Sequence, residues 1–161
     1  MTNKKFTHIK NKNIHMVNIS QKKKSLRIAK AIAIVLFEKH IFKEIMEKGS
    51  PKGEIFSTSR IAGIQAAKKT HFLIPLCHNI TLESISIKFE TLKSKNEIHV
   101  YSECQSFSKT GVEMEAIVAV SVAAITIYDM CKSLSKSIRI LEIKLLSKSG
   151  GKSKDFKNDK F

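Results

Sequence analysis

The alternation of hydrophobic and polar positions predicts strands in three segments of the chain before residue 105. Residues 27–37 are compatible with a helix or a strand, but their apolar side chains follow an alternation, which favours a strand. Residues 84–90 and 98–104 alternate with period two, and the polar linker 93–97 separates them. These two segments therefore predict a hairpin with one buried face.

Other segments have helical spacing. Residues 39–48 predict a short helix that ends at Gly49, since glycine is typical of a helix C-terminus. Residues 57–69 begin with serine and threonine, which cap helices, and carry small residues on one side. The major helix is predicted over 112–134, and its middle, 116–127, is apolar on nearly every side. One sheet covers only one side of such a helix, so a second chain is expected to cover the rest.

Residues 137–146 predict a last strand, and the order of the elements then predicts the fold. The apolar phase of this strand slips between Ile140 and Leu141, which is consistent with a bulge or with burial on both faces. The order is strand, two helices, hairpin, helix and strand. It predicts an α+β fold, an antiparallel sheet with helices packed on one face. We expect one domain over 15–156.

Charge is the unusual feature of the composition. The chain has 29 Lys+Arg against 14 Asp+Glu, a formal net charge of +15, and both ends are basic. Residues 1–14 are predicted to be a flexible basic arm and 157–161 a basic tail. Such an excess suits a polyanion or a membrane surface, although a lysine-rich composition inherited from an A·T-rich genome explains it equally well. With only three arginines, base-specific DNA recognition is disfavoured.

The cysteines and the apolar runs bear on location. The three cysteines, Cys77, Cys104 and Cys131, are odd in number and widely spaced, which is typical of free thiols in a reducing compartment. The longest uncharged apolar run, 116–128, is shorter than the ~20 residues of a membrane span. We expect a soluble, cytoplasmic protein.

Three polar segments are candidates for chemistry: 75–79, 109–115 and 128–132. Each has a structural explanation, because acids suit a helix N-terminus, a lysine suits a C-terminus, and Asp129 with Lys132 could be a plain ion pair. The adjacent Cys77 and His78 are weak evidence for zinc without further ligands.

Six segments together carry a family resemblance. They are residues 52–55, 60–68, 74–78, 109–116, 120–132 and 145–153, which read KGEI, RIAGIQAAK, IPLCH, KTGVEMEA, VSVAAITIYDMCK and LLSKSGGKS. The combination resembles the cyclic pyranopterin monophosphate synthase family, the molybdenum cofactor biosynthesis protein C family. The resemblance extends over residues 16–156.

The resemblance implies a ferredoxin-like subunit in a hexamer, a trimer of dimers, with sites shared between subunits. It implies the substrate 3',8-cyclo-7,8-dihydro-GTP, made from GTP by a radical S-adenosylmethionine cyclase that acts as a functional partner. The product is cyclic pyranopterin monophosphate, formed with release of pyrophosphate by a phosphorus-oxygen lyase. No resident metal or cofactor is implied, and whether a divalent ion accompanies the triphosphate stays open.

The resemblance also implies roles for particular residues. Lys52 and Lys132 would be the general acid/base pair, Asp129 the catalytic carboxylate, and His78 a residue against the substrate. Further residues would bind the substrate: Arg27, Lys148 and the turn Leu76, Cys77 and His78 at the phosphates, and Glu113, Met114 and Glu115 at the base. Such a site suits proton transfers followed by attack on a phosphate. Crowded cations are expected to lower the pKa of the two lysines.

Three positions depart from the family pattern: Asn18 in place of a common Asp, Asn79 in place of Pro, and Lys154 in place of Gly. The first puts an acidic role at position 18 in doubt. The alternative function is a basic nucleic-acid-binding protein, suggested by net charge alone. The chain has two Tyr and no Trp for base stacking, and no known nucleic-acid-binding motif.

Overall fold

The computed structural model describes residues 9–10, 13–151 and 155–158, and its centre is an antiparallel sheet. In space the strands follow the order β4-β5-β3-β6-β7, and every neighbouring pair is antiparallel. Their bounds are β3 Ser25–Leu36, β4 Ser84–Leu92, β5 Glu97–Ser108, β6 Arg139–Ser149 and β7 Phe156–Lys157.

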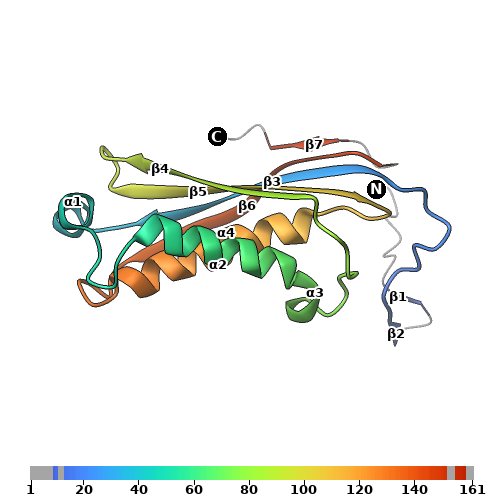
Figure 1. Cartoon of the computed structure of the whole chain (residues 1–161), viewed down its shortest axis with the longest axis horizontal. Helices are drawn as coiled ribbons and strands as arrows, with labels where there is room; N and C mark the ends of the chain where they lie inside the picture. Colours follow the sequence, from blue (N-terminus) through green and yellow to red (C-terminus); the bar gives the residue numbers. More distant parts are fainter. Residues whose placement is uncertain (1–8, 11–12, 152–154, 159–161) are drawn as a thin grey trace, which may run out of the picture.

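Helices cover one face of this sheet (Figure 1). They are α1 Lys39–Lys48, α2 Ile55–Lys68, α3 Thr70–Leu73 and α4 Glu113–Cys131. The long helices α2 and α4 lie side by side under the strands, and α1 lies at one end of the sheet. Strand β3, helix, β4, β5, helix and β6 form the βαββαβ order of a ferredoxin-like fold. The predicted α+β fold is therefore confirmed.

Small residues bring α4 close to the sheet. Alternate residues of β3, among them Ala29, Ala31 and Ala33, are fully buried in one cluster with the alanines and valines of α4. Gly63 of α2 lies against α4, where an added Cβ would overlap the Ala119 carbonyl oxygen. α4 is long and apolar enough, by composition alone, to cross a membrane, but here it forms the core between the sheet and α2.

Two details of the predicted elements are settled by the register and the caps. β6 pairs with β3 with two register shifts, which leave Leu141 and Leu146 unpaired, so the predicted bulge beside Ile140 is confirmed. α2 begins at Ile55, earlier than predicted, and its N-cap residue Glu54 makes no side-chain cap bond. α3 was not predicted.

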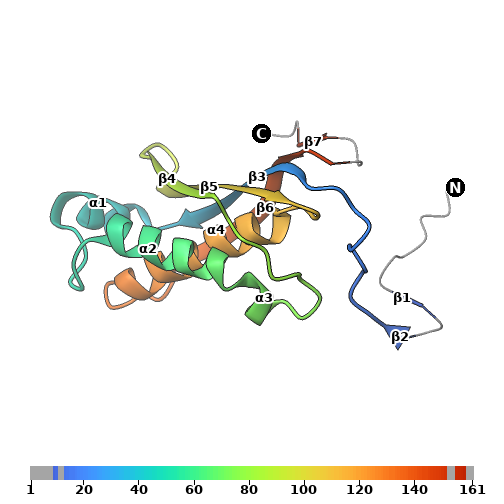
Figure 2. The same ribbon diagram turned by 45° about the vertical axis from the view of Figure 1, so that its right-hand side comes forward.

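The two ends of the chain make small additional pairings. β1 Ile9–Lys10 pairs with β2 Asn13–Ile14 within the segment predicted to be a flexible arm. Figure 2 shows this ribbon away from α1, at the other end of the molecule. The rest of that arm, 1–8 and 11–12, and residues 159–161 of the predicted tail lie outside the described residues. The proposed domain boundaries stay predictions.

Candidate active site

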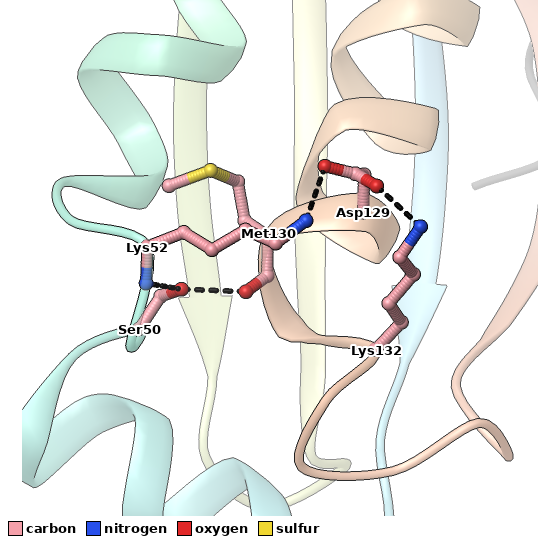
Figure 3. Close-up of polar contacts among 5 residues, drawn as sticks. All are labelled: Ser50, Lys52, Asp129, Met130 and Lys132. Carbon is pink, nitrogen blue, oxygen red and sulfur yellow. Dashed lines mark hydrogen bonds and ion pairs between the residues drawn. The ribbon is translucent and has the colours of Figure 1, made fainter.

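At the C-terminal end of α4, one carboxylate lies between two lysines (Figure 3). The Lys52 Nζ is 2.7 Å from the Asp129 Oδ2, and the Lys132 Nζ is 2.7 Å from the Asp129 Oδ1. All three side chains are about half exposed, so a ligand can reach them. The structure thus brings together three of the predicted catalytic residues in one chain.

The loop between α1 and α2 holds Lys52 beside α4. The Ser50 Oγ accepts a hydrogen bond from the Lys52 backbone N–H at 3.1 Å and donates one to the Met130 carbonyl oxygen at 2.5 Å. Gly53 has φ +106°, a conformation that favours glycine, and its N–H donates to the Ser50 carbonyl oxygen to close the turn. Lys52 is therefore tied to the end of α4 through its backbone as well as its ammonium group.

Lys52, Asp129 and Lys132 form a trio of charged side chains, and their charges shift two pKa values in opposite directions. Hydrogen bonds from Lys132 and then Lys52 lower the pKa of Asp129 to about 2, so its carboxylate stays ionised near neutral pH. The hydrogen bond to Asp129 raises the pKa of Lys132 above its ordinary value. The expectation that crowded cations lower the pKa of Lys132 is wrong for this chain, because its nearest charge is a carboxylate. Near neutral pH Lys132 is therefore an ammonium ion.

At the N-terminal end of α4, a cavity of about 710 Å³ opens between three parts of the chain. It is lined by the segment before β3, the loop before α4 and the end of β6. Six cationic side chains and one carboxylate surround it: Lys22, Lys23, Lys24, Arg27, Lys109, Lys148 and Glu113. Among the residues described here, this cavity has the chemistry of a polyanion site.

Arg27 is held in this cavity by neutral carbonyl groups. Its Nη1 donates to the Gly150 carbonyl oxygen at 2.9 Å, and its Nε donates to the Ser108 carbonyl oxygen at 3.4 Å. Gly150 and Gly151 have positive φ, and a Cβ on Gly151 would overlap the guanidinium group. Since a guanidinium has five N–H donors, Arg27 keeps donors and a full charge for a ligand.

Two other cavity lysines are also positioned. The Lys148 Nζ is 2.7 Å from the Glu113 Oε1, so Glu113 partly compensates this charge. The Lys109 Nζ donates to the Ser20 carbonyl oxygen at 2.6 Å. Two of the predicted phosphate ligands, Arg27 and Lys148, therefore lie in one cavity with Glu113.

The remaining predicted site residues lie near the first turn of α4 or in the loop after α3. Leu76, Cys77 and His78 are half-buried in that loop, and Met114 is half-buried in α4. Burial and then the charge of Glu115 raise the pKa of the Cys77 thiol, so these two side chains are neighbours. Glu115 is 5% exposed, and burial raises its pKa to about 7. The structure places His78 in neither the trio nor the cavity lining.

The trio and the cavity are at opposite ends of one helix. From Glu113 to Asp129 the helix rises about 24 Å at 1.5 Å per residue. In a single chain the predicted site residues are therefore divided between the trio and the cationic cavity. Lys52 and Lys132 belong to the same part and the same chain.

Several cavity residues were missing from the sequence prediction. Lys22, Lys23 and Lys24 were counted only toward the basic N-terminal end of the chain and lie outside the predicted arm 1–14, and Ser25 had no assigned role. Lys109 was within a quoted motif but had no assigned role. The sequence contained one indication for the run 22–24: it directly precedes the strand that carries Arg27, so its lysines are expected to lie near that side chain.

The comparison with known families assigns the chain to one of them. A family model described as the MoaC family matches residues 16–151. This match covers most of the chain, so the protein belongs to the MoaC family. Membership places it in molybdenum cofactor biosynthesis, in a family with an enzymatic role.

Proposed function

We propose that this chain is a cyclic pyranopterin monophosphate synthase, which converts 3',8-cyclo-7,8-dihydro-GTP to cyclic pyranopterin monophosphate and pyrophosphate. The observation that carries the proposal is the contact of Lys52 and Lys132 with the two oxygens of Asp129. Rebuilding a purine as a pterin requires protons to move on and off ring atoms. A lysine beside an ionised carboxylate can donate a proton as an ammonium group and, once it has done so, accept one as the neutral amine.

In this proposal the trio transfers protons and the cavity binds the phosphates. Lys132 enters the reaction as an ammonium ion because Asp129 raises its pKa, and Asp129 holds both lysines in place. In the last step a ribose hydroxyl attacks the α-phosphorus, the bond from that phosphorus to the β-bridging oxygen breaks, and pyrophosphate leaves. The hydroxyl proton passes to a lysine that has already given up its own. Arg27 and Lys148 stabilise the charge on the phosphate oxygens.

We propose that no resident metal is needed to hold the triphosphate. Six cationic side chains against one carboxylate supply enough charge for a nucleoside triphosphate, whether or not a divalent ion accompanies it. The same cavity favours a small polyanion over a nucleic acid, because its cations converge on a bounded volume. We further propose a cytoplasmic enzyme supplied by a radical S-adenosylmethionine GTP cyclase.

The separation along α4 supports a site completed by a second subunit, as in the hexamer that the family resemblance implies. The trio of one chain would face the cavity of another. α4 also presents Ile125, 55% exposed, and α2 presents Ile61, 59% exposed, on the outside of the helical layer. Such apolar surface is suited to contact with another copy of the chain.

Incubation of the purified protein with the cyclic dihydro-GTP tests the reaction, with mass detection of the pterin and measurement of released pyrophosphate. Formation of both products supports the proposal, and an unchanged substrate contradicts it. Mixed oligomers test the shared site. Co-expressed Lys132→Ala and Arg27→Ala chains should regain activity, because some sites receive an intact trio and an intact cavity. Lys52→Ala with Lys132→Ala is the matched control and should not recover, since both changes affect the trio.

A further inference from the structure

One polar atom at the cavity has no partner. The Ser25 Oγ is buried and makes no hydrogen bond within the described part of the chain. Buried hydroxyl groups are normally hydrogen-bonded, and leaving one unpaired costs free energy. Ser25 is one of the residues that line the cavity, so a ligand seated there and contacting this hydroxyl would supply the missing partner.

Ser25 lies beside the best-positioned cation of the cavity. It is the first residue of β3, two positions before Arg27, and side chains two apart on a strand point to the same face. That face is the helix-covered one, because Ala29 and Ala31 continue it into the core with α4. Ser25 and Arg27 both line the cavity, together with Lys109 and Gly111 from the loop before α4.

The lysines near Ser25 would contribute to ligand binding differently from Ser25. Lys22, Lys23 and Lys24 are exposed and form no ion pair with any residue described, so solvent and salt screen them. Ser25 is neutral and half-buried, so its contribution comes from one hydrogen bond at short range. The cavity thus combines an outer group of screened charges, Lys22, Lys23 and Lys24, with less exposed donors that include Arg27 and Ser25.

We propose that Ser25 is a binding residue of this cavity, whose hydroxyl donates a hydrogen bond to a phosphate oxygen that also contacts Arg27. The inference rests on the proposed function for the identity of the phosphate compound, but the hydrogen bond itself requires only a polyphosphate in the cavity. A hydrogen bond to a charged oxygen contributes about 1.5 kcal/mol or more, so its loss weakens binding roughly tenfold.

The test measures inorganic triphosphate binding to the full-length protein by calorimetry. Ser25→Ala should raise the dissociation constant roughly tenfold, and Ser25→Thr, which keeps the hydroxyl on a strand, should restore it. The loss in Ser25→Ala should be the same at low and high salt, because no charge has been removed. In turnover, KM for the cyclic dihydro-GTP should rise with kcat nearly unchanged.

A matched control is Ser59→Ala. Ser59 also has a buried Oγ without a partner, but it lies in α2 and does not line the cavity. It should leave triphosphate binding unchanged. If Ser25→Ala binds triphosphate like the wild type, or if Ser59→Ala weakens binding equally, the inference is wrong. If triphosphate binding follows the expected pattern but no pterin forms, the inference stands and the proposed reaction fails.

Discussion

The two ends of α4 organise charge in different ways. At the C-terminal end, a single carboxylate contacts two lysines at 2.7 Å each, so the charges are paired and their protonation is coupled. At the N-terminal end, six cationic side chains share one carboxylate and surround an open volume. Paired charges hold and pass protons, whereas unpaired charges attract an anion. The difference indicates that proton transfer and anion binding can be separated by substitution.

Lys52→Ala and Lys132→Ala are expected to give the largest difference between the loss of turnover and the change in triphosphate binding. Each should lower kcat more than ~100-fold, because each removes a group to which we assign proton transfer. Neither side chain lies in the cavity, so inorganic triphosphate binding should be unchanged. Rate assays and calorimetry on the same samples check both statements, with circular dichroism to verify folding. Near-normal turnover in either variant would remove the trio from the mechanism.

Asp129→Asn probes the coupling inside the trio. Asp129 raises the pKa of Lys132, so its replacement should let that pKa fall towards its ordinary value. Lys132 then loses its proton at a lower pH, and the alkaline limb of the pH–kcat profile should move to lower pH. In the wild type, Asp129, with a pKa of about 2, should cause no acid limb near neutral pH. An alkaline limb that stays in place would assign it to another group.

Glu115→Gln tests the buried carboxyl near the cavity end of α4. The folded pKa of Glu115 is about 7, above its ordinary 4.5, so folding favours the protonated form. Its stabilising contribution is complete below about pH 4.5 and is lost as the pH rises through about 7. Gln keeps the neutral form at every pH. The variant should therefore match the wild type near pH 4.5 and exceed it above pH 7 by on the order of 3 kcal/mol in urea unfolding. A constant difference would contradict this assignment.

Lys23→Gln with Lys24→Gln tests the outer charges of the cavity. Because these side chains are exposed, the double variant should weaken triphosphate binding only a few-fold at low salt, and by less at high salt. The salt dependence of binding should become shallower. Calorimetry over a salt series gives the slope. An unchanged slope would mean that these lysines do not act on a ligand in the cavity.

The sequence predicted the elements best where local pattern and tertiary packing agree. α1 has the predicted bounds, because amphipathic spacing and Gly49 define both its buried face and its end. The start of α2 was misplaced because Ser57 and Thr58 resemble caps. In the fold their hydroxyls bond back to Glu54, inside the first turn. A side chain that competes for nearby backbone groups does not mark a boundary by itself.

The trio and the cavity also differ in how far local sequence pattern predicts them. Asp129 and Lys132 are three residues apart on one helix, so their ion pair is visible in the sequence, whereas Lys52 comes from a loop 77 residues away and was found through the family resemblance. The cavity brings together three distant segments. No local pattern contains such a juxtaposition, so Lys109 and Ser25 could be assigned to the cavity only from the fold.

The smallest effect is expected for a hydroxyl that belongs to neither end of α4. Ser59 is fully buried in α2, and its Oγ has no partner within the described residues. Removing an unpaired buried hydroxyl relieves its desolvation cost, while the space left is smaller than a methyl group. Ser59→Ala should therefore leave the free energy of unfolding within about 1 kcal/mol of the wild type, on the stabilising side. Urea unfolding measures the change, and kcat and KM should stay as they are. A clear loss of stability would show that the hydroxyl has a partner in the assembled protein, in contrast to Ser25, whose removal should change ligand binding instead.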